Sequence, residues 1–206
     1  MTTPGASKWY RSQGAPAEQQ LQFRLGPEAV LEWLPRETIF FDGSLATLSL
    51  EVNLDHAARF FGWEILCFGR TAAGERWRAG SLALRTRVRS AGRLIWSESA
   101  KLLANDAFFA SPVGLAGCTV SGTFVAAGVG PDPGLLAACR ALGNGGQGDE
   151  GAHGARCGIT ALPQVVVARY LGHSSQQAFQ WFGSLWSLLR PKLLGTVARA
   201  PRLWAT

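Results

Sequence analysis

The chain has 206 residues, a hydrophobic content of 47% and a mean hydropathy of +0.08, which together predict a single folded domain and exclude a disordered chain. No apolar run reaches the ~18 residues of a membrane span and no apolar signal segment opens the chain, so we expect a cytoplasmic protein without a membrane partner. The formal net charge is +6, but the arginines are scattered through predicted strands instead of forming an RNA-binding motif, and we expect no nucleic acid partner.

The first predicted strand is Leu21–Leu25, where apolar and polar residues alternate up to a Gly-Pro pair. A second strand region runs from Leu31 to Leu54 and contains a turn at Asp42-Gly43, because the β-branched and aromatic residues before the turn favour an extended backbone. From Ala46 onward every second residue is apolar, and the residues between them are polar. This alternation predicts a strand with one buried face and one solvated face.

The segment Arg59–Phe68 (RFFGWEILCF) is apolar on both faces, which predicts a strand in the middle of a sheet that is covered on both sides. Glu64 is the exception, since it lies between Trp63 and Ile65. A buried carboxylate is costly unless it is paired or functional. Glu64 is therefore either the ion-pair partner of an arginine or a site residue, and both interpretations stay open.

A β-hairpin is predicted for Trp77–Leu103, with its loop at Ser90–Arg93. Apolar residues occupy the inward face of its first strand, whereas Arg85, Arg87 and Arg89 occupy the outward face. Arginines spaced two residues apart repel one another and suit an acidic partner surface. An ordinary solvated face is the alternative explanation of this arginine stripe.

The region after the hairpin is predicted to contain strands and a short helix. The strands are expected at Cys118–Ala126, Cys157–Leu162 and Val165–Leu171, and the helix near 134–142. Clusters of glycine and proline separate these elements. The expected fold class is therefore mostly β.

The C-terminal segment predicts the clearest helix, near 175–190. Ser174 and Gln177 form a capping box at its start, and Pro191 is expected to end it. The helix is apolar around much of its circumference, including Trp181 and Trp186. We therefore expect neighbours on more than one side, among them a partner protein.

The sequence contains no motif for phosphate binding, dinucleotide binding or hydrolysis, so it gives little support for catalysis. Its four cysteines form no CxxC pair and are expected to be reduced, half-buried apolar residues. His153 and Cys157 are four positions apart and could bind a metal. A small metal-dependent hydrolase that uses this pair is the alternative function.

Six segments follow one another along almost the whole chain: TTPGASKWYRS, LEWLPRETIFFDGSLATLSLEVNL, FFGWEILCFGR, GERWRAG, WFGSLWSLLRP and PRLWAT. In this combination they resemble the UreD family of urease accessory proteins, which is also called UreH. The resemblance implies a mostly β fold with strands in a β-helix-like stack. It also implies a family segment ahead of TTPGA that is absent here, so we expect one UreD-like domain over residues 1–206, shortened at its N-terminus.

The same resemblance implies a non-enzymatic scaffold that binds apo-urease and the accessory protein UreF, which recruits the GTPase UreG for nickel insertion into the urease active site. Nickel would be bound transiently, and no cofactor is expected to be bound tightly. Candidate residues of the nickel path are Glu64, Glu37 and Asp42, because carboxylates bind a divalent ion weakly enough to release it. The candidate partner-binding residues are Arg85, Arg87, Arg89, Trp181 and Trp186.

Overall fold

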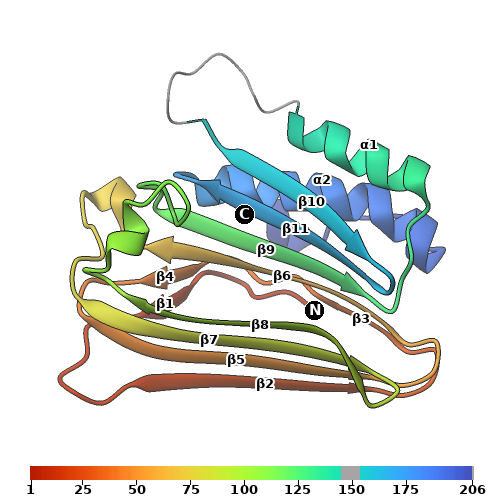
Figure 1. Cartoon of the computed structure of the whole chain (residues 1–206), viewed down its shortest axis with the longest axis horizontal. Helices are drawn as coiled ribbons and strands as arrows, with labels where there is room; N and C mark the ends of the chain where they lie inside the picture. The colour runs from red at the N-terminus through yellow and green to blue at the C-terminus, as the bar shows by residue number, and fades with distance from the viewer. Residues whose placement is uncertain (145–153, 206) are drawn as a thin grey trace.

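The computed structural model describes residues 1–144 and 154–205, which form three layers (Figure 1). The middle layer is a seven-stranded sheet, which we call the central sheet, and a four-stranded sheet, the outer sheet, packs against one of its faces. The helices pack against its other face. None of the helices in the described part of the chain is long and apolar enough to cross a membrane.

Each sheet combines strands that are distant in sequence. The strands of the central sheet are β1 (Ser7–Trp9), β3 (Val30–Trp33), β4 (Thr38–Phe40), β6 (Arg59–Phe68), β9 (Val120–Ala127), β10 (Arg156–Leu162) and β11 (Val165–Gly172). Those of the outer sheet are β2 (Ala17–Leu25), β5 (Ser44–Leu54), β7 (Gly80–Ser90) and β8 (Arg93–Leu103). The central sheet has the order β1-β4-β6-β9-β11-β10, with β3 also paired to β6, and the outer sheet has the order β2-β5-β7-β8. The predicted mostly β fold is confirmed.

From β2 to β7 the chain passes back and forth between the sheets. The strands β2, β5 and β7 pair in parallel in the outer sheet, and β3 and β4 pair in parallel with β6 in the central sheet. In contrast, β8, β9, β10 and β11 pair antiparallel with their neighbours. The molecule is thus a pair of mixed sheets. The β-helix-like stack that the resemblance implies is not observed, because antiparallel pairing of β8, β9, β10 and β11 makes both sheets mixed.

Strand β6 lies inside the central sheet, as its two apolar faces predict. One face carries Phe61 and Trp63 into a continuous apolar cluster beneath the helices. The other face carries Phe60 and Leu66 toward the outer sheet, where they belong to separate apolar clusters. Glu64 lies between these clusters on the same face of the strand.

Helix α1 (Pro133–Asn144) begins after Asp132, whose carboxylate accepts a hydrogen bond from the amide of Leu135 at 2.8 Å. It packs beside α2 (Ser175–Leu194) and against β10. The buried residues of both helices share the apolar cluster of the central sheet. All four cysteines of the chain carry free thiols, as predicted.

The start of α2 confirms its predicted cap, whereas its end differs from the prediction. The hydroxyl of Ser174 accepts a hydrogen bond from the amide of Gln177 at 3.2 Å. Pro191 does not end the helix, because a proline in the last turn removes only one hydrogen bond. The helix ends instead at Gly195, which adopts a left-handed conformation with φ 68° and donates its amide to the carbonyl of Pro191.

Candidate functional site

A layer of polar side chains crosses the space between the sheets, where the apolar clusters are interrupted. We call it the polar layer, and its members are Glu64, Thr86, Glu98, Thr123 and Arg169. Glu64, Thr123 and Arg169 are register neighbours across β6, β9 and β11 of the central sheet. Thr86 and Glu98 are register neighbours across β7 and β8 of the outer sheet. Strand pairing therefore assembles this layer from segments that are distant in sequence.

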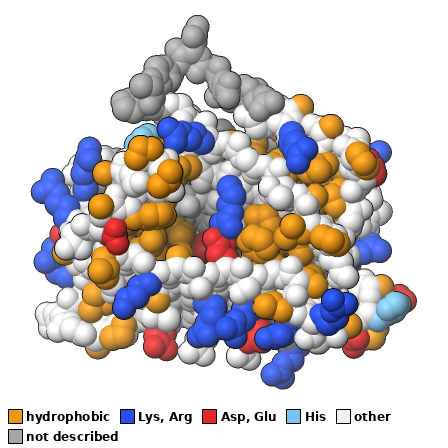
Figure 2. Space-filling model, in the orientation of Figure 1, with side chains coloured by type: hydrophobic (Ala, Val, Ile, Leu, Met, Phe, Trp, Pro, Cys, Tyr) orange, Lys and Arg blue, Asp and Glu red, His pale blue; other side chains and the backbone are white. Residues whose placement is uncertain are grey.

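The polar layer lines a cavity of about 420 Å³ between the sheets. Ser121 adds a further hydroxyl group, and most of the remaining wall is apolar. The side chains of Glu98 and Arg169 are 34% and 45% exposed, so the cavity reaches the surface beside them. Figure 2 shows the corresponding face of the molecule hollowed between the sheets.

Glu64 points into the cavity and is otherwise surrounded by protein. Burial raises the pKa of its carboxyl group to about 7, and the negative charge of Glu98 contributes to this rise. Among residues 1–144 and 154–205, no side chain forms an ion pair with Glu64. The ion-pair interpretation of Glu64 is therefore wrong, and its role as a site residue stays a prediction.

Arg169 lies on the more exposed side of the polar layer. Its Nη1 atom donates hydrogen bonds to Glu98 Oε1 at 2.6 Å and to Thr123 Oγ1 at 2.8 Å. The guanidinium carbon lies 5.7 Å from the centre of the Trp96 ring. These contacts join β11 of the central sheet to β8 of the outer sheet. One positive charge thus lies beside the carboxylates of the cavity.

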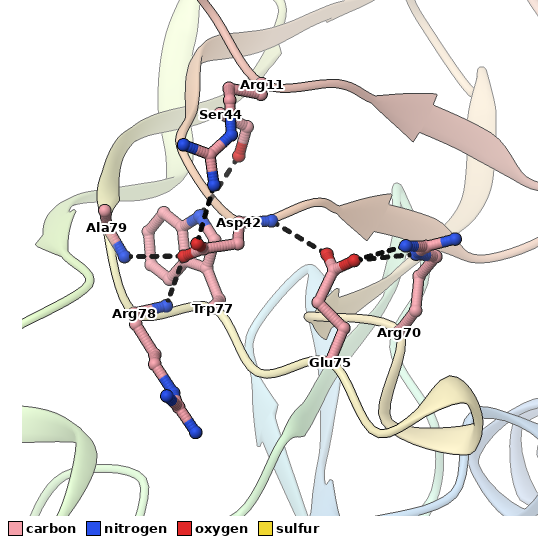
Figure 3. Close-up of polar contacts among 8 residues, drawn as sticks. All are labelled: Arg11, Asp42, Ser44, Arg70, Glu75, Trp77, Arg78 and Ala79. Atoms are coloured by element: carbon pink, nitrogen blue, oxygen red, sulfur yellow. Dashed lines mark hydrogen bonds and ion pairs between the residues drawn. The ribbon is translucent and has the colours of Figure 1, made fainter.

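Asp42 lies at the turn between β4 and β5, and hydrogen bonds occupy its carboxylate (Figure 3). Its Oδ1 atom accepts the amides of Arg78 and Ala79 at 2.8 Å each, and its Oδ2 atom accepts Arg11 Nη2 at 3.0 Å. These backbone amides are the main reason why the pKa of Asp42 is lowered, and Arg11 contributes. Asp42 thus fastens the segment before β7 to the turn, and this geometry gives no support to a place in a nickel path.

Glu37 lies on the opposite side of the central sheet from Glu64. It lines a groove between α2 and the C-terminal segment, together with Phe179 and Trp204. Burial raises the pKa of the Cys67 thiol to about 12, and the charge of Glu37 contributes to this rise. The sheet therefore separates Glu37 from Glu64, and the three predicted carboxylates do not form one site.

Across residues 1–144 and 154–205, no group of three or more His, Cys, Asp or Glu side chains could hold a metal ion. His153 lies outside the described residues. Burial raises the pKa of the Cys157 thiol to about 11, which disfavours its thiolate form. The described residues thus give no support to a hydrolase that uses His153 and Cys157.

Arg85, Arg87 and Arg89 lie on the solvent-facing side of β7, as the alternation predicted, while Val88 is buried on the other side, and Arg85 also borders the cavity. Arg89 Nε lies 4.0 Å from a carboxylate oxygen of Glu51. Within the described ranges, Arg85 and Arg87 have no carboxylate within 4.0 Å. Binding of a partner by these arginines stays a prediction.

The two tryptophans predicted to bind a partner differ in burial. Trp186 is buried, its Nε1 atom donates to Glu32 Oε1 at 3.0 Å, and its ring centre lies 5.1 Å from that of Trp204. It is covered within the chain, so the structure gives no support to its contact with a partner, which stays a prediction. Trp181 is half-buried beside Phe182, and for this residue the partner contact stays a prediction.

Glu98 and Arg169 are the members of the polar layer with charged side chains that the sequence analysis missed. Each carries the signal that singled out Glu64, a charge within a strand of otherwise apolar inward-facing residues. Glu98 shares its face of β8 with Trp96, and Arg169 follows the apolar run Val165–Ala168. The same rule, applied to every strand, would have identified both residues.

The fold and the polar layer define a class: a β protein with two packed mixed sheets and a partly open cavity between them, which carboxylate, hydroxyl and guanidinium groups line. Residues 1–205 match the family model described as UreD urease accessory protein. The chain belongs to this family, whose members are non-catalytic accessory proteins of urease maturation. The resemblance stated from the sequence segments is thereby confirmed.

Individual relatives agree with the family match. The chain is 46% identical over 211 residues to the urease accessory protein UreD of Dechloromonas aromatica (strain RCB), and the match covers all of this chain and 70% of that protein. It is 44% identical over 206 residues to UreD of Janthinobacterium sp. (strain Marseille), covering all of this chain and 68% of that protein. The organisation of residues 1–206 as one domain stays a prediction.

Proposed function

We propose that this chain acts in the cytoplasm as a non-enzymatic scaffold and metallochaperone that binds apo-urease and UreF, through which UreG is recruited. Nickel is a transient cargo in this proposal and passes through the cavity between the sheets toward the urease active site. Family membership supports the role in maturation. The main support for the nickel route is that the carboxylate of Glu64 lines the cavity and has no ion-pair partner among the described residues.

The ligands of the polar layer suit a cargo ion better than a resident cofactor. Glu64 and Glu98 offer carboxylate oxygens, and Thr86 and Thr123 offer hydroxyl groups. Such oxygen ligands hold Ni²⁺ less firmly than imidazole or thiolate ligands do, so the ion can leave again. A cavity of about 420 Å³ also has room for water molecules of ~30 Å³ each, so the ion can keep part of its hydration shell.

The solvent-facing side of the outer sheet is the partner surface that we propose. Arg85, Arg87 and Arg89 place positive charge on a sheet face that no helix covers in the described part of the chain (Figure 1). Guanidinium groups form strong, directional hydrogen bonds with carboxylates. An acidic surface on another protein of the maturation complex therefore fits this side, and its attraction would accelerate the encounter.

Co-expression of the chain with UreF and the urease subunits, followed by size-exclusion chromatography and metal analysis, tests the proposal. Glu64→Gln keeps the shape of the side chain and removes its charge, so we expect an intact complex and a large loss of nickel in urease. Glu18→Gln, on an exposed position of β2, is the matched control and should leave nickel loading unchanged. Failure to co-elute with UreF would contradict the scaffold, and full nickel loading with Glu64→Gln would contradict the nickel route.

A further inference from the structure

We propose that Arg169 is a resident counter-cation that competes with Ni²⁺ for the carboxylates of the polar layer and thereby keeps the ion mobile. This inference rests on the nickel route proposed above. It assigns a specific task to a residue that touches the cavity on its more exposed side. Without such a competitor, paired carboxylates in a partly enclosed cavity would hold a divalent ion for longer.

The contact between Arg169 and Glu98 makes the competition direct. Arg169 Nη1 lies 2.6 Å from Glu98 Oε1, so it occupies a position that an ion bound to this oxygen would need. A cation that binds this oxygen must therefore displace the guanidinium group from it. When the ion leaves, the guanidinium group can restore the same hydrogen bond.

The surroundings of Arg169 allow this movement. Thr123 Oγ1, at 2.8 Å, and the ring of Trp96, at 5.7 Å, give the guanidinium group other favourable contacts beside the cavity. The side chain of Arg169 is 45% exposed, so packing does not lock it in one position. Arg169 can thus leave Glu98 without leaving the cavity mouth.

Charge explains why the competition shortens the stay of the ion. With both Glu64 and Glu98 ionised, an added Ni²⁺ would neutralise the pair, but the charge of Arg169 then leaves an excess of positive charge. A neighbouring positive charge lowers the affinity of a carboxylate for a proton by about 10- to 1000-fold. We expect the same direction for Ni²⁺, with a change of about tenfold or more.

Calorimetric titration of the full chain with NiCl₂ measures the affinity for Ni²⁺. A second experiment measures the rate at which bound Ni²⁺ is released to a chelator. Arg169→Met should raise the affinity for Ni²⁺ about tenfold and slow its release, whereas Arg169→Lys, which keeps the charge, should stay close to the unmodified chain. Arg24→Met removes the same charge at an exposed position of β2 that does not line the cavity, and it should change neither quantity. Thermal unfolding of each variant verifies that it is folded.

The Glu64→Gln variant in the same titration distinguishes a failure of the competition by Arg169 from a failure of the nickel route. A lower affinity in Glu64→Gln together with an unchanged affinity in Arg169→Met would overturn the competition and leave the nickel route intact. An unchanged affinity in Glu64→Gln would overturn the nickel route and the competition with it. If Arg169→Met loses affinity, Arg169 assists binding and the inference is wrong.

Discussion

The two faces of the central sheet differ in how their side chains are packed. On the face toward the helices, Trp63, Phe124 and Phe182 belong to one continuous apolar cluster, with ring centres about 6 Å apart. On the face toward the outer sheet, the apolar residues form separate clusters, and the polar layer and its cavity lie between them. The same strands thus build a continuous apolar core on one side and a polar layer with a cavity on the other.

Two neighbouring residues of β6 show how the two faces differ in their effect on stability. Trp63 contributes its large ring to the dry side, whereas Glu64, its neighbour in sequence, places a carboxylate in the cavity without an ion-pair partner among the described residues. A large ring in the core contributes several kcal/mol to stability, while an ionised carboxylate in a cavity reduces it. The helix side therefore contributes most of the stability from packing, and the ionised carboxylate on the cavity side reduces it.

Truncation on the helix side should have the largest effect. Phe182 is fully buried and contacts Trp63 and Phe124, so Phe182→Ala should lower the free energy of unfolding by about 3–5 kcal/mol. The companion change Thr86→Ala, in the wall of the cavity, should cost less than ~1 kcal/mol. Denaturant unfolding of both variants measures the difference. Equal losses would show that the two faces are packed alike.

Removal of the buried charge should stabilise the chain in a pH-dependent way. The pKa of Glu64 is raised from 4.5 to about 7 in the folded chain, so the folded state binds more protons than the unfolded state between these values. Stability from this group therefore falls as the pH rises from 4.5 to about 7. Glu64→Gln should add on the order of 3 kcal/mol at pH 8 and little at pH 4.5.

Unfolding in buffer with a metal chelator, at several pH values, measures this effect. A gain of equal size at both ends of the pH range would show that shape, and not charge, is responsible. A loss of stability at pH 8 would show that Glu64 has a partner in solution and that the cavity side is better packed than described.

Asp42 provides the opposite case, a carboxylate whose charge stabilises the fold. It accepts two backbone amides and Arg11, so Asp42→Ala should lower the free energy of unfolding by about 2 kcal/mol at pH 7. Because the pKa of Asp42 is lowered from 3.8, its contribution is present at neutral pH and is lost as the pH falls below 3.8. Glu18→Ala, at an exposed position, is the control. Thermal melts that match the control would refute the structural role of Asp42.

The arginine stripe should have the smallest effect on stability. Replacing Arg85, Arg87 and Arg89 by Gln changes charges on the solvent-facing side of the outer sheet, so the free energy of unfolding should move by ~0.5 kcal/mol or less. The rate of association with an acidic partner should fall and lose much of its dependence on salt. Stopped-flow association at low and high salt measures this. An unchanged rate at low salt would make the stripe an ordinary solvated face.

Most of the fold could be predicted because its signals are local. Alternation located the strands, including β5 and the hairpin of β7 and β8, and the capping box located the start of α2 at Ser174. The end of α2 was missed because a proline in the last turn is tolerated when Gly195 closes the helix. Glu64 was predicted as a charge in an apolar strand, and the same rule identifies Glu98 and Arg169. That these residues lie close together could not be predicted, because it depends on strand pairing between distant segments.

Passage of nickel between the two sheets is tested most directly by a substitution that obstructs the cavity. Ser121 lines the cavity on β9, so Ser121→Phe should fill part of the passage without removing a charge, and Ser121→Ala should leave it open. The measurement is the nickel content of urease matured with each variant, in complexes shown by size-exclusion chromatography to be intact. If nickel passes through the cavity, its content should be close to background for Ser121→Phe and complete for Ser121→Ala. Full loading with Ser121→Phe would contradict passage of nickel between the sheets.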